Sequence, residues 1–178
     1  MKYANNLNST NNIMKKTVLF IVALLLFGYL SPFAFAQSVS TEEMLSKKIG
    51  TDGLVLGMKQ SEAIFEIGKM GNFTLADKCE HPQGGELLYY LCQKQKIAYV
   101  ICVNTQGLIW GIEKQFFVNE NYVESTFKSQ QADLLYRYGT PIINEMTHII
   151  WRGEHYKVEL KVQPAQYEYN IREMYILL

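Results

Sequence analysis

The hydrophobic and polar positions of this chain follow two kinds of pattern, which predict helices separated by antiparallel strands. Apolar residues recur at helical spacing in a short segment that ends at Gly68 and in a longer one from about Glu120 to Tyr138. Leu87–Val118 and Met146–Leu177 instead have the pattern of strands joined by turns, with clean alternation of apolar and polar residues in the second stretch and apolar residues on both faces in the first. A capping box at Ser40 opens a further short helix. The predicted order is therefore helix, helix, meander, helix, meander.

The two strand-rich stretches match each other without a gap at an offset of 59 residues. Turns fall on turns, although few residues are identical, as in Val103 on Val162 and Ile112 on Ile171. This pattern predicts an α+β fold of two tandem helix-plus-antiparallel-meander repeats, with the helices packed on one face of the sheet. The corresponding parts are an N-terminal segment, a first repeat and a second repeat, over residues 37–56, 57–118 and 119–178.

Turn chemistry sets the expected register of the second meander. Gly153 stands where a type II′ hairpin needs a glycine, and this hairpin places Trp151 opposite Tyr156. His148 then faces Glu159 on the outer surface of the sheet, which we interpret as a solvated contact. The second meander thus has one apolar face and one charged face.

When the same register is moved back by 59 residues, it predicts that the outer face of the first meander is apolar. A patch of that size needs a cover on a monomer in water. One cover is the chain's own segment Thr41–Met58, and another is a protein partner or a second copy. A register error of one residue would exchange the two faces and remove the patch. The predicted partner-binding residues are Tyr89, Leu91, Val100 and Ile109.

The N-terminal residues read as a secretory signal peptide. A short basic start, the apolar run Thr17–Leu30 and the small-x-small sequence ending at Ala36 predict cleavage before Gln37. The polar residues ahead of Met14 favour a true start at that methionine. The expected product is periplasmic or secreted, with no membrane anchor after cleavage, because the apolar run is shorter than a membrane span.

Charge and composition narrow the function classes. Removal of residues 1–36 takes three lysines and no acidic residue, so the remaining 142 residues carry 14 basic and 17 acidic side chains, a net charge of −3. This near-neutral balance without a basic stripe argues against a nucleic-acid partner.

Candidate chemistry is sparse. The three cysteines Cys79, Cys92 and Cys102 form no C-x-x-C pair, and their odd number leaves open whether any disulfide forms. No zinc-ligand spacing, nucleophile motif or phosphate-binding glycine loop is present, so we expect no metal, no cofactor and no enzymatic activity.

Several short motifs resemble a known family. Leu56–Ile64 and the closing Ile67-Gly68-Lys69 are similar to the helix opening and closing of the BamE (SmpA/OmlA) outer-membrane assembly lipoproteins and of the tandem-repeat β-lactamase inhibitor protein. Lys96–Val103 and Leu108–Phe117 resemble a hairpin of that group. The resemblance implies two-layer α/β units whose sheet binds other proteins, without catalytic residues. Gln37 stands where BamE-type proteins have their lipobox cysteine, which argues against a lipid anchor.

We therefore expect an exported, non-enzymatic protein-binding or envelope-assembly module that uses the sheet face of the first repeat. An inhibitor of a secreted or periplasmic hydrolase is the alternative, and a small-ligand carrier is the third possibility. What co-purifies with the chain separates the three: an assembly complex, a hydrolase or a bound small molecule.

Overall fold

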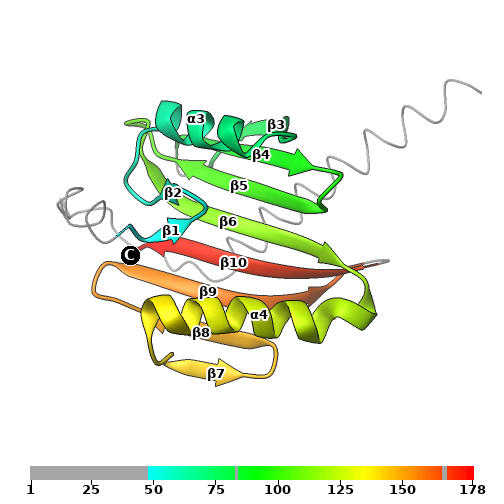
Figure 1. Cartoon of the computed structure of the whole chain (residues 1–178). Helices are drawn as coiled ribbons and strands as arrows, with labels where there is room; N and C mark the ends of the chain where they lie inside the picture. Colours follow the sequence, from blue (N-terminus) through cyan, green and yellow to red (C-terminus); the bar gives the residue numbers. More distant parts are fainter. Residues whose placement is uncertain (1–47, 83, 166–167) are drawn as a thin grey trace, which may run out of the picture. The chain divides into compact units, whose positions relative to one another are not determined.

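A computed structural model describes residues 48–82, 84–165 and 168–178 of the chain (Figure 1). Two short strands come first, followed by a helix and four strands, and then by a second helix and four more strands. The elements are β1 (Gly50–Thr51), β2 (Leu54–Val55), α3 (Gln60–Met70), β3 (Thr74–Glu80), β4 (Glu86–Cys92), β5 (Ile97–Val103), β6 (Ile109–Val118), α4 (Glu120–Tyr138), β7 (Ile143–Glu145), β8 (His148–Arg152), β9 (Tyr156–Pro164) and β10 (Tyr169–Leu177).

Eight of the strands form one antiparallel sheet in the order β3-β4-β5-β6-β10-β9-β8-β7. β6 and β10 are its two central strands, and they pair from Tyr169 opposite Val118 to Ile176 opposite Gly111. β1 and β2 form a separate small hairpin. The last strand, β10, therefore lies beside β6, which ends about fifty residues earlier in the chain. This pairing joins β3–β6 and β7–β10 into one sheet.

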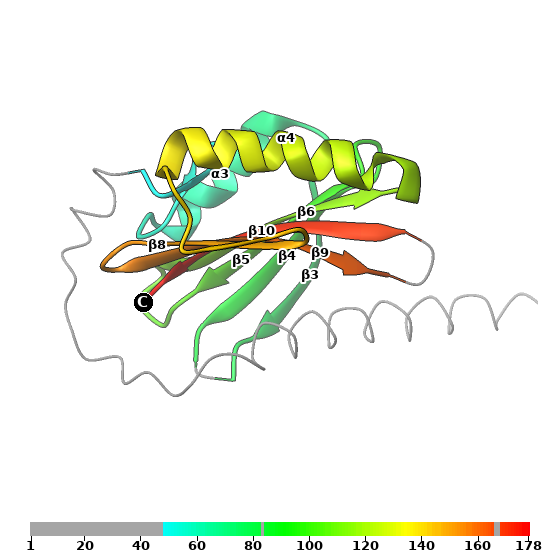
Figure 2. The same cartoon turned by 90° about the horizontal axis from the view of Figure 1, so that it is seen from below.

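The main core lies between the sheet and the two helices, which Figure 2 shows on the same side of the sheet. Alternate residues of each strand point into this core, as the two-residue period of a strand requires. Trp151 and Tyr175 are its largest fully buried side chains. The helices contribute a small set of buried residues, namely Ala63, Ile67, Phe127 and Leu134.

Helix α4 has the predicted bounds and explains how the second half of the sheet is covered. Phe127 and Leu134 lie seven residues apart, about two helical turns, so they share the face that packs on the core. Gly139 ends the helix with a φ of 72°, and its carbonyl accepts a hydrogen bond from the Trp151 indole at 2.8 Å. This bond fixes the end of α4 above β8.

The predicted architecture of two tandem repeats is wrong. The structure contains two helices and one large eight-stranded antiparallel sheet, and it is mostly β. The periodicity of a strand shows which of its faces is buried, but it carries no information on which strand lies next to it. The continuous β6–β10 ladder could not be read from the pattern for that reason. The proposed boundaries at residues 57 and 119 stay predictions.

The β8–β9 hairpin also differs from its predicted register. Trp151 lies opposite Val158, and not opposite Tyr156, so the strands are displaced by two residues. A shift of two residues leaves every side chain on its predicted face. Gly153 has no positive φ as a type II′ turn would require, but a Cβ there would lie 2.2 Å from the Tyr156 ring. The glycine is needed for space.

Two N-terminal predictions lie outside the described residues: the signal peptide with its cleavage at Ala36, and the helix opened by Ser40. Among the residues that are described, no helix has the length and apolar character needed to cross a membrane.

Candidate nucleic-acid interface

The face of the sheet turned away from the helices carries a row of basic side chains on three adjacent strands. Arg172 of β10 lies directly opposite Lys161 of β9, and Lys161 lies directly opposite His148 of β8. Their neighbours Ile171, Val162 and Ile149 belong to the core, so the three side chains point away from it. Each strand contributes one member of this row.

A second basic pair lies four residues farther along β9, where Lys157 is directly opposite Arg152. Directly opposed side chains in an antiparallel sheet have Cβ atoms about 4.5–5.5 Å apart, and like charges at that distance destabilise the sheet. We call the side chains of these two rows the basic face: His148, Arg152, Lys157, Lys161 and Arg172.

One carboxylate lies between the two rows. Glu159 accepts a hydrogen bond from Lys157 Nζ at 2.8 Å, and its other oxygen lies 2.9 Å from His148 Nε2. Burial acts to raise the pKa of the Glu159 carboxyl, but Lys157 and His148 outweigh it and hold the pKa below its usual value. Glu159 is therefore ionised, and it neutralises part of the charge around it.

Arg172 is held by a second carboxylate, on the neighbouring strand β6. Its guanidinium forms a bidentate pair with Glu113, in which Nη2 lies 2.6 Å from Oε2, and Nη1 donates to Gln163 Oε1 at 2.7 Å. Gln115 donates to the same carboxylate at 2.6 Å. Arg172 and Glu113 are both 2% exposed, so this pair orients Arg172 while taking up most of its charge.

The charge of this face differs from that of the whole chain. Over β8, β9 and β10 it carries four Lys or Arg side chains and one Glu, a net charge of +3, whereas the chain has a formal net charge of zero. Glu113 on β6 and Glu145 on β7 lie on the same face beside Arg172 and His148, and with them included its net charge is +1. Arg152 is exposed, and Lys157, Lys161 and His148 are partly exposed, so the cations can reach an anion in solution.

The predicted site residues fall on two different faces. Tyr89 and Val100 lie opposite each other on β4 and β5, Leu91 lies opposite Ala98, and all of them share the sheet face with the basic face. Val100 is 2% exposed, and burial, followed by the charge of Glu113, raises the pKa of Tyr89 to about 12. Whether Tyr89, Leu91 and Val100 contact another molecule stays a prediction.

Ile109 does not belong with them. A β-bulge between Cys102 and Val103 inserts Trp110 as an extra residue in β6, and Ile109 therefore points into the helix-side core. It is 1% exposed, and its N–H donates to the Met58 carbonyl at 2.9 Å. The alternation of the sequence was extrapolated without this extra residue, which placed Ile109 on the wrong face.

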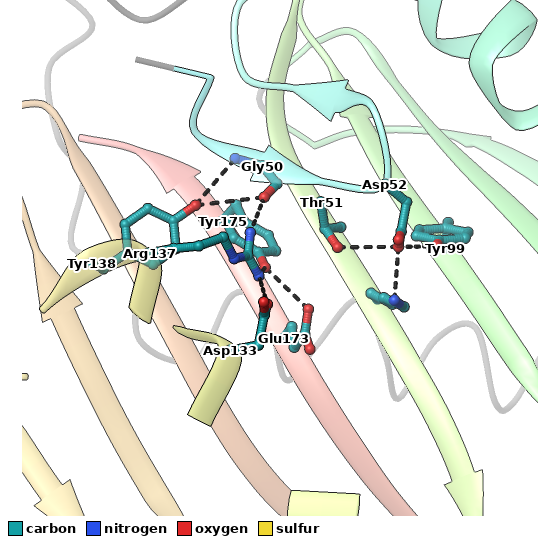
Figure 3. Close-up of polar contacts among 10 residues, drawn as sticks. Gly50, Thr51, Asp52, Tyr99, Asp133, Arg137, Tyr138, Glu173 and Tyr175 are labelled. Atoms are coloured by element: carbon teal, nitrogen blue, oxygen red, sulfur yellow. Dashed lines mark hydrogen bonds and ion pairs between the residues drawn. The ribbon is translucent and has the colours of Figure 1, made fainter. Parts of the chain in front are cut away.

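A buried polar network lies on the helix side of the sheet, where the β1–β2 hairpin is fastened to the core (Figure 3). Arg137 of α4 donates to the Gly50 carbonyl at 2.7 Å and to the Tyr175 hydroxyl at 3.1 Å, and it pairs with Asp133 at 2.6 Å. This single guanidinium ties α4, β1 and β10 together.

The other end of the hairpin is held by Asp52. Its carboxylate pairs with Lys114 of β6 at 2.7 Å and accepts a hydrogen bond from the Tyr99 hydroxyl (Figure 3). Burial acts to raise the pKa of Asp52, but Lys114 and Tyr99 together hold it below the usual value. The network has a clear structural function, which is to fix the N-terminal hairpin on the sheet.

Glu173 is the one member of this network with an incomplete set of hydrogen bonds. The Tyr175 hydroxyl donates to its Oε2 at 3.0 Å, while Oε1 has no hydrogen-bond partner in the part of the chain that the structure describes. Glu173 is 1% exposed, and burial raises the pKa of its carboxyl despite the opposing influence of Lys114. A raised pKa at a buried site is compatible with acid chemistry, but equally with a structural carboxyl.

The cysteines and histidines form no metal site in the described ranges, where no group of three ligating side chains is found. Cys79, Cys92 and Cys102 are all free thiols. His81 is buried with its ring against Trp110, at a centroid distance of 5.1 Å.

The fold and the basic face thus define a mostly β protein with a positively charged sheet surface. Residues 40–131, just over half of the chain, match the family described as "Ribosomal protein L7Ae/L30e/S12e/Gadd45 family", and the chain belongs to this family. The match ends within α4, so β7–β10 lie outside it. No curated protein and no solved structure gives a significant match.

Family membership corrects four predictions from the sequence. The chain is not a BamE or β-lactamase-inhibitor relative, and the expected export-linked binding module, hydrolase inhibitor and small-ligand carrier do not agree with a family of RNA-binding proteins. The description of the chain as a periplasmic or secreted BamE-like module conflicts with it as well, whereas the expected export itself stays a prediction. The exclusion of nucleic acid as a partner conflicts with this family for the same reason, whereas the expected protein partner or self-association stays a prediction.

Sequence reasoning missed the basic face because its members are far apart in the chain. The net charge is a sum over the whole chain, so it does not show where the charges gather. A search along the sequence for a basic stripe finds only cations that are close together in the chain. Lys161 and Arg172 are eleven residues apart and become neighbours only through the β9–β10 register. The available signal was the spacing of Lys157 and Lys161, which places both on one face of a strand.

Proposed function

We propose that this protein binds RNA, and that the basic face is the binding surface. Membership of a ribosomal protein family supports RNA as the ligand. The observation that carries the location is the cluster of partly or fully exposed Arg152, Lys157 and Lys161 on one sheet face, where Lys157 lies directly opposite Arg152. Cations that lie directly opposite each other repel and lower the stability of a sheet that faces only water. Phosphates of an RNA lying across the strands would neutralise these cations, so the same arrangement favours binding of a polyanion.

The chemistry of the surface fits this ligand. Lys and Arg side chains contact phosphates, and the amide side chains of Gln163 and Asn170 lie beside them on the same face. The proposed function is binding without catalysis, because Glu159 and His148, the titratable pair on this face, contact each other and Lys157. Such a pair orients charges and has no nucleophile next to it within the described residues.

A direct test measures the fluorescence anisotropy of a labelled RNA of twenty nucleotides as the full chain is added at low salt. The double variant Lys157→Gln, Lys161→Gln removes two cations from the basic face. Lys94→Gln, Lys128→Gln is the matched control, since it removes the same charge from exposed positions in the β4–β5 turn and on α4.

We expect the first double variant to bind at least ten-fold more weakly and the control to bind like the unchanged chain. Phe65→Ala and Lys69→Gln test the family-matched segment, because Phe65 is 65% exposed on α3 and Lys69 lies over its ring at 5.1 Å. Loss of binding in these variants alone would move the RNA surface to α3. Absence of RNA binding by the unchanged chain would overturn the proposal.

A further inference from the structure

Next to the basic row lies a third row of side chains on the same face, and it contains an aromatic ring and two amides. Phe117 of β6 is directly opposite Asn170 of β10, and Asn170 is directly opposite Gln163 of β9. This row lies two residues along each strand from the row of Arg172 and Lys161, a distance of about 6.6–6.8 Å. The cations of one row and the amides of the next are therefore close enough to contact the phosphate and the base of one nucleotide.

The two amides have hydrogen-bonding groups left over. Asn170 donates to Gln115 at 3.4 Å, but its Oδ1 has no partner in the described part of the chain. Gln163 accepts a hydrogen bond from Arg172 at 2.7 Å through Oε1, so its amide nitrogen is the donor that it can offer to a ligand. Asn170 therefore offers an acceptor, and the amide nitrogen of Gln163 a donor, on neighbouring strands. Native proteins leave few buried polar atoms unsatisfied, and each one calls for an explanation.

Phe117 adds a flat apolar surface at the end of this row. Its side chain is partly exposed, whereas its neighbour Phe116 packs against the core. Stacking of a base on an aromatic side chain contributes about 1–3 kcal/mol per base and accepts any base, because every base has a π-face. A base in a duplex is already stacked and its edge is already paired, so only an unpaired base can use both the ring and the amides.

We infer that Phe117, Asn170 and Gln163 form a subsite for one unpaired nucleobase, with its phosphates on Lys161 and the rest of the basic face. The inference rests on the proposed RNA-binding function and specifies the class of RNA, which is single-stranded. The base stacks on Phe117 while its edge donates to Asn170 Oδ1 and accepts from the Gln163 amide. An adjacent donor and acceptor suit adenine, whose edge offers N6 as donor and N7 as acceptor.

The test compares two labelled probes on the full chain, a single-stranded adenine-rich RNA of twelve nucleotides and a duplex of the same sequence. Phe117→Ala removes the ring, and Asn170→Ala with Gln163→Ala removes the amides. Tyr122→Ala is the aromatic control, because Tyr122 is 62% exposed on α4, on the helix side of the sheet. Thermal unfolding of each variant verifies that the fold is intact.

We expect Phe117→Ala to weaken single-strand binding by about 5- to 150-fold, the range that corresponds to one stacked base. Duplex binding by that variant and single-strand binding by Tyr122→Ala stay unchanged. If Phe117→Ala unfolds, Asn170→Ala with Gln163→Ala gives the same answer through weaker binding of the adenine-rich single strand and unchanged binding of the duplex.

The outcomes separate this inference from the function on which it rests. Equal affinity of the unchanged chain for the two probes, or single-strand binding that neither variant weakens, overturns the subsite and leaves RNA binding in place. Failure of the unchanged chain to bind either probe overturns both.

Discussion

Lys161 of β9 and Arg172 of β10 lie directly opposite each other across two neighbouring strands, with both side chains on the sheet face turned away from the helices. The structure offsets part of their repulsion, because Glu113 pairs with Arg172 through two hydrogen bonds. His148 lies opposite Lys161 on its other side. Lys161 therefore has an arginine on one flank and a histidine on the other, and the proposed RNA phosphate would lie beside all three.

Lys161→Gln should weaken RNA binding and reduce its salt dependence. Removal of one phosphate contact weakens binding and reduces the slope of log K against log salt by about 0.7–0.9. Anisotropy titrations between about 50 and 200 mM salt measure this slope, and urea unfolding verifies that the variant keeps its fold.

The control for this prediction is Lys128→Gln. Lys128 pairs with Glu124 on the exposed surface of α4, so its loss changes net charge equally without touching the basic face. A salt slope that falls by the same amount in both variants would show that only overall charge matters, and it would contradict a localised surface.

Glu159→Gln should strengthen RNA binding. The carboxylate of Glu159 contacts Lys157 at 2.8 Å and His148 at 2.9 Å, so it competes with phosphate for both. The amide keeps the size of the side chain and removes the charge, which frees Lys157 for the ligand. We expect a tighter dissociation constant and a salt slope that is steeper by about 0.7–0.9. Unchanged or weaker binding would mean that Glu159 does not compete with RNA.

The same substitution should destabilise the protein above the usual pKa of a glutamate. Because the folded pKa of Glu159 is depressed, its ionised form stabilises the fold at neutral pH, and that contribution disappears as the pH falls through the folded value. Urea unfolding at pH 7 and pH 3 measures it. A loss of stability that is equal at both pH values would contradict an ionic contribution.

Removal of one partner of the buried pair Arg172–Glu113 should lower the free energy of unfolding strongly, whereas replacement of both partners should lower it much less. Glu113→Ala leaves the Arg172 guanidinium buried without its carboxylate, and such single removals cost about 3–5 kcal/mol. Replacement of both partners, Glu113→Leu with Arg172→Met, should recover most of that loss, since no charge then remains buried. Denaturant unfolding of the two variants decides the matter. A double variant no more stable than the single one would refute the explanation.

Glu173→Gln should stabilise the protein at neutral pH. Burial raises the folded pKa of Glu173, so the native state holds its proton more tightly than the unfolded chain. Stability is then lost as the pH rises above about 4.3, the unfolded value for Glu, toward the folded pKa. The amide does not titrate and avoids this loss. The gain should be present at pH 7 and absent at pH 4 in urea unfolding, and a gain that is independent of pH would disprove it.

Cleavage after Ala36 stays a prediction that the chain itself can test. Residues 48–178 hold all of the described strands and helices, so removal of residues 1–36 would leave the basic face complete. Mass spectrometry of the protein recovered from its native cell should find Gln37 as the first residue. Recovery of a chain that still contains Thr17–Leu30 would show that no signal peptide is removed.

Particular residues show how far the sequence could predict this structure. The bounds of α4 followed from helical spacing and from Gly139, and the assignment of residues 148–162 to two sheet faces followed from strict alternation. Both are local properties of the chain. Ile109 was misplaced because a bulge adds a residue without a signature in the sequence. The single sheet and the basic face depend on which strands pair, and that choice is made by long-range packing.

The most direct test of the central claim is to map where RNA touches the protein. Ultraviolet crosslinking of the full chain to a single-stranded RNA, followed by mass spectrometry of the crosslinked peptides, identifies the contacting strands. The account predicts crosslinks on peptides from β8, β9 and β10, around Lys157, Lys161 and Asn170, and on the end of β6 at Phe117. Crosslinks confined to α3 and α4 would contradict it. A crosslinking yield no higher than that of an unrelated acidic protein would contradict it as well.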